Sequence, residues 1–268
     1  MSVHSPSRPP AATPPAPDPR RRTPPVLDPR PGGIAERFAS RLGDIHPALA
    51  FLAALLAGFA LLAAASVLLA LLVVHVAVPP DGLALGGLDE RLPETLAHHR
   101  TGTLTTLSEI GTEAGGSPVL PILVGLLALV FAFMRRWRLA AFAAFVLAAE
   151  SATYKLTSLL VPRDRPSVHR LEDLPVDASY PSGHTAASVA VYAGLVLLLT
   201  SAITGNLRRA LAWTGAILLV SFVAFSRMYR GMHHPLDVIG GVAIGIGAIL
   251  LLIFACRVAG AAAERRDR

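Results

Sequence analysis

The stretch from Ser226 to Asp237 reads S-R-M-Y-R-G-M-H-H-P-L-D. It joins the end of one long apolar segment, residues 209–225, to the start of another, residues 235–256. Ionisable side chains are costly at a membrane boundary, and those found there usually have a function. Interfacial anchoring explains the two arginines, since basic residues commonly flank spanning helices. Anchoring does not explain why His233 is followed four residues later by an aspartate, so we expect a site for an anion in this stretch.

The composition predicts an integral membrane protein with an all-α fold. The chain has 268 residues and is 53% hydrophobic but only 16% charged, whereas soluble domains are usually about a quarter charged. The apolar residues form runs with the length of a spanning helix. We therefore expect six transmembrane helices, near residues 47–78, 118–134, 137–160, 184–203, 209–226 and 235–256.

The remaining segments differ in composition from these runs. Residues 1–45 begin with a stretch that holds 11 of the 22 prolines, and we expect them to form a disordered Pro/Arg-rich tail. Residues 46–257 would form the six-helix domain, and residues 258–268 a second, basic tail. Residues 79–117 have an amphipathic pattern that predicts one or two helices lying at the membrane interface. Gly240, Gly241, Gly245 and Gly247 indicate close helix packing.

The distribution of arginine predicts the orientation in the membrane. If the N-terminus is cytoplasmic, 16 of the 24 basic residues fall on the inner side, as topology rules demand. Both termini would then be cytoplasmic and Ser226–Asp237 would face outward. Positive charge beside apolar runs also argues against a nucleic-acid partner. All basic residues but one are arginine, which is typical of a GC-rich bacterial genome, so we expect a bacterial cell membrane.

Three segments fall on this outer side, and their chemistry suits a phosphoryl group. Arg165 and Arg227 carry planar, permanently charged forks that hold phosphate oxygens in bidentate fashion. Ser182 and Gly183 lead into a helix whose free N–H groups and positive dipole end attract an anion, and the Ser182 hydroxyl adds a donor. The segment from Lys155 to Pro166 and the segment from Tyr180 to His184 would thus meet the opening stretch at one face.

Two histidines have the positions of a nucleophile and an acid. Asp237 falls in the first turn of the last helix, near His233, and can accept a hydrogen bond from one of its ring nitrogens. That bond would fix the tautomer and raise the basicity of the other nitrogen. His184 comes from a different helix and has the chemistry of a general acid for a leaving oxygen.

These residues resemble the signatures of the type 2 phosphatidic acid phosphatase superfamily, which also includes vanadium haloperoxidases. Ser226, Arg227, His233 and Asp237 match S-R-x5-H-x3-D, and Pro181–His184 match P-S-G-H. The resemblance covers about residues 47–256. It implies that His233 attacks phosphorus and forms a phosphohistidine, that His184 protonates the leaving group and later activates water, and that no metal or other cofactor is needed.

The first signature of that family, K-x6-R-P, is matched only at its end. Arg165 and Pro166 fit, but the lysine position falls on Ser158. Lys155 lies three residues earlier on roughly the same helix face, and it either reaches the phosphate or serves as an interfacial anchor. Arg163 is the other candidate for the missing charge.

The resemblance implies a membrane phosphatase that hydrolyses a lipid phosphate or a lipid pyrophosphate, such as phosphatidic acid or a polyprenyl pyrophosphate. The alternatives are a vanadate-dependent haloperoxidase and a non-catalytic protein that binds lipid phosphates. We expect His234 to be a bystander or a substrate contact. For the membrane-embedded Glu150, we expect an internal ion pair. The oligomeric state and the exact lipid are left open.

Overall fold

The structure is a computed structural model, and it describes residues 23–79 and 85–267. Within these ranges the chain is helical and has no strand, which confirms the all-α fold. Expectations for residues 1–22, 80–84 and 268 lie outside the described residues. The helical elements in chain order are η2 (Pro25–Leu27), α1 (Ile34–Arg41), α2 (Pro47–Leu72), the π-helical turn η3 (Val73–Ala77), α3 (Gly86–His98), α4 (Gly102–Ala114), α5 (Val119–Phe133), α6 (Trp137–Leu160), α7 (Gly183–Ser188), the π-helical turn η4 (Val189–Ala193), α8 (Gly194–Ser201), α9 (Asn206–Tyr229) and α10 (Pro235–Arg266).

Six stretches of the described chain are long and apolar enough to cross a membrane, as predicted. The bounds of two of them differ from the prediction. The second stretch begins at Gly102 because α4 is apolar enough to extend α5, and the two helices are separated only by the break at residues 115–118. The last helix continues to Arg266 instead of ending near residue 256, because Gly260, Ala261 and Ala262 keep it packed against the rest of the protein.

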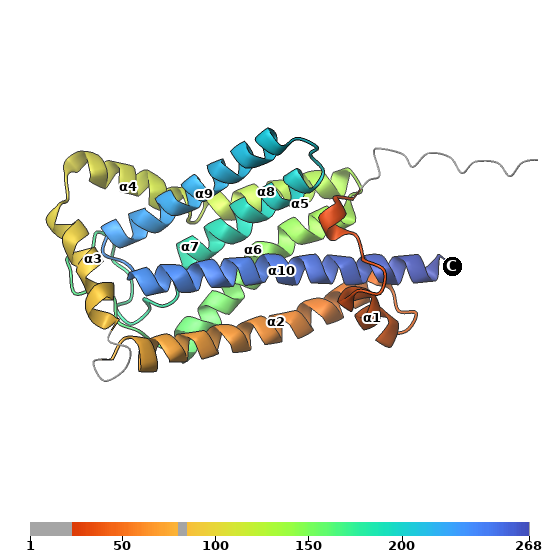
Figure 1. Ribbon diagram of the computed structural model, residues 1–268, viewed down its shortest axis with the longest axis horizontal. Helices are drawn as coiled ribbons and strands as arrows, with labels where there is room; N and C mark the ends of the chain where they lie inside the picture. Colours follow the sequence, from red (N-terminus) through yellow and green to blue (C-terminus); the bar gives the residue numbers. More distant parts are fainter. Residues whose placement is uncertain (1–22, 80–84, 268) are drawn as a thin grey trace, which may run out of the picture.

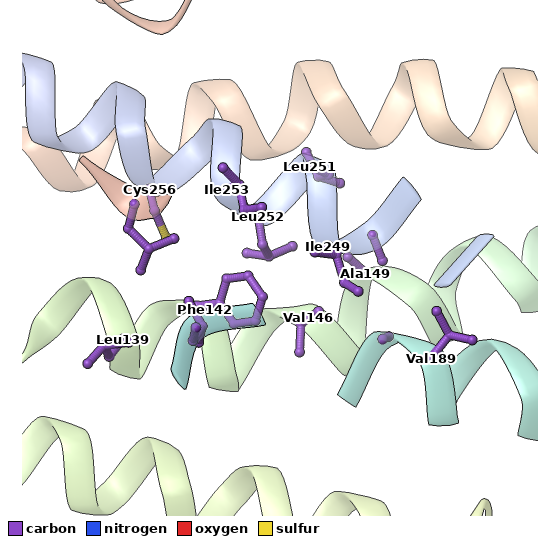
Figure 2. Packing of buried hydrophobic residues seen from close by; sticks show 14 residues of the cluster. Leu139, Phe142, Val146, Ala149, Val189, Ile249, Leu251, Leu252, Ile253 and Cys256 are labelled. Atoms are coloured by element: carbon purple, nitrogen blue, oxygen red, sulfur yellow. The ribbon is translucent and has the colours of Figure 1, made fainter. Parts of the chain in front are cut away.

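Helix α10 runs through the middle of the bundle, between α2 on one side and α6 and α7 on the other (Figure 1). Just over half of the residues in the most apolar part of α10 are buried. In the α4–α5 stretch the share is 11%, and its leucines face outward. A cluster of apolar side chains joins α10 to α6 and to η4. Figure 2 shows Phe142 and Val146 of α6 facing Leu252 and Ile249 of α10, with Val189 beside them.

Glycines let α10 approach the start of α7 at backbone distance. A Cβ at Gly241 would lie 2.5 Å from the carbonyl oxygen of Ser182, and one at Gly245 would lie 2.6 Å from that of Ala186. The Ser182 amide donates a hydrogen bond to the Asp237 carbonyl at 2.9 Å. The interpretation of these glycines as packing residues is confirmed. Close contact of small residues replaces the hydrophobic driving force that helices lack in lipid.

Part of the predicted N-terminal tail is helical. Between residues 23 and 45 the chain forms η2 and α1, and α1 packs its buried Ala35 and Ala39 against the C-terminal part of α10. Leu27 of η2 is fully buried in the main apolar cluster. The structure differs from the predicted disordered tail in this segment. A few small apolar residues at helical spacing are enough to dock the short helix α1 on α10, in spite of the prolines that precede it.

The opposite end of the bundle is covered by α3 and by the loop from residue 161 to residue 182 (Figure 1). Arg100, just after α3, ties this cover to the end of α9. Its Nε and Nη2 atoms donate to the Tyr229 carbonyl at 3.1 and 2.9 Å, and Nη1 donates to the carbonyl of His169 at 2.7 Å. A cation at the C-terminus of a helix also complements the helix dipole. The cover is therefore fixed to the helices beneath it.

We predict that Gly241→Ala destabilises the protein, because the added methyl group meets a backbone carbonyl that cannot move without shifting α7. Overpacking of this kind costs about 1–3 kcal/mol. The thermal unfolding midpoint in detergent should fall, measured against Gly215→Ala as the control, since a Cβ at Gly215 meets nothing within 4 Å. Equal midpoints for the two variants would contradict the close contact.

Candidate active site

The three sequence segments that were expected to meet line one cavity of about 330 Å³. Arg165 comes from the α6–α7 loop, His184 from the start of α7, Arg227 from the end of α9 and His233 from the turn before α10. The structure therefore brings together the two predicted arginines and the two predicted histidines. The other lining residues belong to the α4–α5 break, α5, α6, α7 and the loop, and they are Gly115, Gly116, Ser117, Leu120, Pro121, Leu147, Glu150, Ser151, Tyr154, Leu174, Gly183 and Ala187.

Arg227 is fully buried, and only one of its three side-chain nitrogens is bound by other described residues. Its Nη1 atom binds the hydroxyl of Thr112 and both carboxylate oxygens of Glu172, the latter at 2.7 and 2.9 Å. Nε and Nη2 have no hydrogen-bond partner among the described residues. A buried cation with unsatisfied donors is costly. An anion in the cavity would satisfy both, and the free edge of the fork has the geometry for two phosphate oxygens.

Glu172 in the loop is a counter-ion that the sequence did not single out. Besides Arg227 it binds Nε of Arg230 at 2.6 Å, so Arg230 is a buried partner of this carboxylate. Burial raises the pKa of Glu172, but the charges and hydrogen bonds of the two arginines outweigh it and lower the pKa overall. Nothing in the pattern of the loop distinguishes Glu172 from Asp164, Asp173 or Asp177, so sequence reasoning had no signal for it.

Arg165 is held by backbone carbonyls rather than by carboxylates. Its Nε atom donates to the Pro175 carbonyl at 2.7 Å and Nη1 to that of Met232. Burial lowers the pKa of Arg165, and the nearby charge of Arg227 acts in the same direction. Two arginines that repel each other across a cavity favour the binding of an anion between them.

His233 is oriented by a backbone group. Its Nδ1 atom lies 2.7 Å from the carbonyl oxygen of Ser179, which can only accept, so Nδ1 carries the proton and donates. Nε2 is then the unprotonated nitrogen of the neutral ring. Burial, together with the charge of Arg227, lowers the pKa of His233 to about 4 against the opposing influence of Asp237. The ring is therefore neutral near pH 7, as a nucleophile must be.

The expected hydrogen bond between Asp237 and His233 is not formed. The Oδ2 atom of Asp237 lies 3.7 Å from Nδ1 of His233. This oxygen instead accepts the hydroxyl of Ser179 at 2.5 Å and the backbone amide of His234 at 2.8 Å, and it lies 3.2 Å from Nδ1 of His234. The hydrogen-bonding capacity of Oδ2 is therefore used by Ser179 and His234 and not by His233. Asp237 orients His233 indirectly, because it fixes Ser179, whose carbonyl holds the ring.

His234 belongs to a network that joins α3 to the start of α10. Its ring contacts two carboxylates, Asp237 through Nδ1 and Glu90 through Nε2, the latter at 2.8 Å. Burial opposes protonation, but the bonds to Asp237 and Glu90 outweigh it and raise the pKa of His234. Asp237 also binds Arg163, which binds Asp89 with its other terminal nitrogen. His234 thus caps the start of α10 and does not line the cavity.

His184 faces the cavity beside the break between α4 and α5. A Cβ at Gly116 would lie 3.0 Å from Nε2 of His184, so only glycine leaves the imidazole its full space. Gly183 lines the cavity and packs on the ring of Tyr154. Ser182, which was expected to donate to the anion, is fully buried and shares its hydroxyl with Thr185 at 3.0 Å. Its side chain does not line the cavity.

Neither candidate for the displaced lysine of the first signature lines the cavity. Lys155 is exposed on α6, and the cavity is reached by Tyr154 and Ser151 instead. Arg163 is occupied by Asp89 and Asp237. Lys155 lies on the right helix for the signature, but its helix position turns it away from the site. The structure supports the anchoring alternative for Lys155.

The ion pair expected for Glu150 is not formed. Glu150 is 1% exposed on α6 and lines the cavity. Its Oε2 atom accepts the hydroxyl of Ser151 at 3.0 Å, and Oε1 has no partner among the described residues. No group of three His, Cys, Asp or Glu residues that could hold a metal ion occurs in the described ranges.

The comparisons with known proteins agree with this geometry. The family model of the PAP2 superfamily matches residues 139–259. A decaprenylphosphoryl-5-phosphoribose phosphatase of Mycobacterium tuberculosis is 33% identical over 156 residues, which are 56% of this chain and 80% of the relative. An undecaprenyl-diphosphatase of Sulfolobus acidocaldarius is 33% identical over 147 residues, which are 54% of this chain but only 65% of the relative, just under two thirds of its length.

A solved structure has the same fold. The crystal structure of a transmembrane PAP2 type phosphatidylglycerolphosphate phosphatase from Bacillus subtilis is similar with a TM-score of 0.58 and 24% sequence identity. The similarity covers 77% of this chain and 93% of that one. At this identity the likeness speaks for the arrangement of the helices alone.

We predict that Arg227→Lys weakens the binding of inorganic phosphate by about tenfold or more, because a lysine cannot present the two parallel donors of the guanidinium fork. Lys155→Met is the matched control and should change the affinity less than about twofold, since an exposed charge outside the cavity contributes little. The affinity is measured from the shift of the unfolding midpoint with phosphate concentration. Equal losses in the two variants would contradict the assignment.

Proposed function

The chain belongs to the PAP2 superfamily, and we propose on that basis that it is a membrane phosphatase that hydrolyses a lipid phosphate or a lipid pyrophosphate. Phosphatidic acid and polyprenyl pyrophosphate represent the two substrate types. The observation that carries the proposal is the cavity itself. It combines a neutral, oriented histidine, His233, with the free donors of a buried arginine, Arg227. Together these groups suit nucleophilic attack on phosphorus.

In this mechanism Nε2 of His233 attacks the phosphorus atom in line with the bond to the lipid oxygen. The nitrogen–phosphorus bond forms as the phosphorus–oxygen bond breaks, and His184 gives a proton to the departing oxygen. Water then attacks the phosphohistidine and loses its proton to His184, which restores both histidines and releases phosphate. Arg165 and Arg227 stabilise the charge on the phosphoryl oxygens throughout, together with the N–H groups at the start of α7.

The surrounding residues keep the nucleophile in place. Ser179 holds the His233 tautomer, and Asp237 positions Ser179 through its hydroxyl. Asp237 is therefore a positioning residue in this scheme. The stabilisation of charge by arginines and helix N–H groups makes a metal unnecessary, and we propose that the enzyme works without a metal ion or other cofactor.

The active site would lie on the extracytoplasmic face of a bacterial cell membrane. The arginine count supports this orientation, with both termini cytoplasmic. The first described α-helix, α1, and the end of α10 are packed together at the end of the bundle opposite α3 (Figure 1). An even number of spans places both ends of the chain on the same side of the membrane, and this packing agrees with it.

The function is tested by measuring phosphate release in detergent, in the presence of EDTA, from a panel of lipid phosphates and lipid pyrophosphates. We expect the wild type to be active and His233→Ala to lose activity by about a thousandfold or more, since removal of a catalytic nucleophile leaves only residual catalysis. His99→Ala, an exposed histidine at the end of α3, is the control. Activity that survives in His233→Ala would overturn the mechanism, and a requirement for a divalent metal would overturn the metal-free scheme.

The orientation is tested with His169→Cys in a Cys256→Ser background. Residue 169 is exposed on the α6–α7 loop, whereas Cys256 is buried. The new thiol should react with a membrane-impermeant reagent added to whole cells. Labelling that occurs only after lysis would place the active site on the cytoplasmic face.

A further inference from the structure

The cavity has two ends of different electrostatic character. The cationic side chains that line it, Arg165 and Arg227, come from the α6–α7 loop and from the last turn of α9. Both lie at the end of the bundle that carries the cover. Among the described residues that line the cavity, the side chain with a carboxyl group is that of Glu150, on α6.

The position of Glu150 along the bundle follows from helix geometry. Helices α6 and α7 are consecutive spans and run in opposite directions, and Tyr154 of α6 packs on Gly183, the first residue of α7. Glu150 lies one turn before Tyr154, so it is at the level of Ala187, one turn into α7. The carboxyl group therefore lies deeper in the membrane than the arginines and His233.

None of the described arginines and lysines lines the deep half of the cavity. Besides Glu150 and Ser151 it is lined by Leu147 of α6, Leu120 and Pro121 of α5, and Ala187. Glu150 is almost completely buried there, its Oε1 atom has no partner among the described residues, and its Oε2 atom has only the Ser151 hydroxyl. This half can accept one hydrogen-bonding group and apolar carbon, but it offers no counter-ion to a second negative charge.

The transferred phosphoryl group has to lie at the cationic end, next to His233. The rest of the substrate leads from there to the lipid, past His184 and into the deep half. In a lipid diphosphate this next group is a second phosphate, which would be desolvated beside an unpaired carboxyl group without a cation. In a phosphate monoester the next atom is the oxygen of an alcohol, followed by carbon and uncharged polar groups.

We propose that the site selects phosphate monoesters of lipid alcohols over lipid diphosphates, and that Glu150 determines this specificity. The inference rests on the proposed phosphatase function and narrows its substrate class. The phosphorus–oxygen bond that breaks is then the bond to an alcohol oxygen, and the proton from His184 converts the departing alkoxide into the neutral lipid alcohol. The carboxyl group of Glu150 accepts a hydrogen bond from a hydroxyl group of that alcohol.

The selectivity is measured with a polyprenyl monophosphate and a polyprenyl diphosphate of the same chain length, so that only the number of phosphates differs. Phosphatidic acid serves as a second monoester. Initial rates of the full-length protein in detergent give kcat/KM for each. We expect the monophosphate to exceed the diphosphate by about tenfold or more, as expected when a second charge is rejected. A diphosphate that is used equally well or better would overturn the inference and leave the phosphatase function intact.

The role of Glu150 is tested with Glu150→Gln, which keeps the size and hydrogen bonding of the side chain but cannot be negatively charged. At alkaline pH, where a buried carboxyl group ionises, we expect the preference for the monophosphate to shrink by about threefold or more, mainly because kcat/KM for the diphosphate rises. Glu109→Gln, an exposed position on α4, is the matched control and should keep the wild-type preference. Inhibition by inorganic phosphate should be unchanged in both variants, which shows that the cationic end is intact. An unchanged preference in Glu150→Gln would exclude Glu150 as the determinant.

The two proposals fail in different ways. A wild-type protein that releases phosphate from none of the lipid substrates would overturn the phosphatase function. Activity on these lipids without the expected order of preference would overturn only the specificity.

Discussion

The position of Arg163 between two buried carboxylates is the constraint on which the site depends. One terminal nitrogen binds Asp89 of α3 and the other binds Asp237 of α10, while the backbone of Arg163 pairs with Asp177 and Ser179 in the loop. A single side chain thus joins α3, the α6–α7 loop and α10, the helix that follows His233. Removal of one partner from a buried ion pair leaves the other charge uncompensated. The pKa of Arg163 is raised, because the two carboxylates outweigh its burial. The ring of His233 is therefore held by a network anchored in the cover, rather than by a direct bond to an acid.

The sequence was informative where chemistry acts over short distances. Lipid thickness sets the length of apolar runs, so six spans were predicted correctly, and the spacing within S-R-x5-H-x3-D placed Arg227 and His233 at one helix junction. Close helix packing at the glycines of α10 was also predicted, because glycine has few other reasons to recur in a spanning helix, but the partner, α7, was not. The bounds of the second span and of α10 were wrong, since hydropathy does not show where a helix continues by packing small residues.

The contacts that the sequence could not show are those between residues far apart in the chain. Ser179 binds His233 through a backbone carbonyl, which every residue has, so no side-chain pattern marks it. Glu172 lies among similar acids in an irregular loop. Lys155 was attractive because it is one helical turn from the position of the family signature, but the rotation of α6 presents Tyr154 to the cavity instead. A helix face is fixed by its packing partners, and these are known only from the fold.

The bridge formed by Glu172 has a consequence for turnover. This carboxylate already neutralises part of the charge of Arg227 and Arg230, so a phosphate in the cavity would meet less net positive charge than two unpaired arginines offer. The free energy of phosphate binding is therefore smaller than it would be at two arginines without a carboxylate partner. Tight binding of the inorganic product would slow an enzyme more than weak binding of the substrate, since only interactions that strengthen in the transition state increase the rate. In the proposed mechanism, the internal anion Glu172 beside Arg227 would thus limit inhibition by the released phosphate.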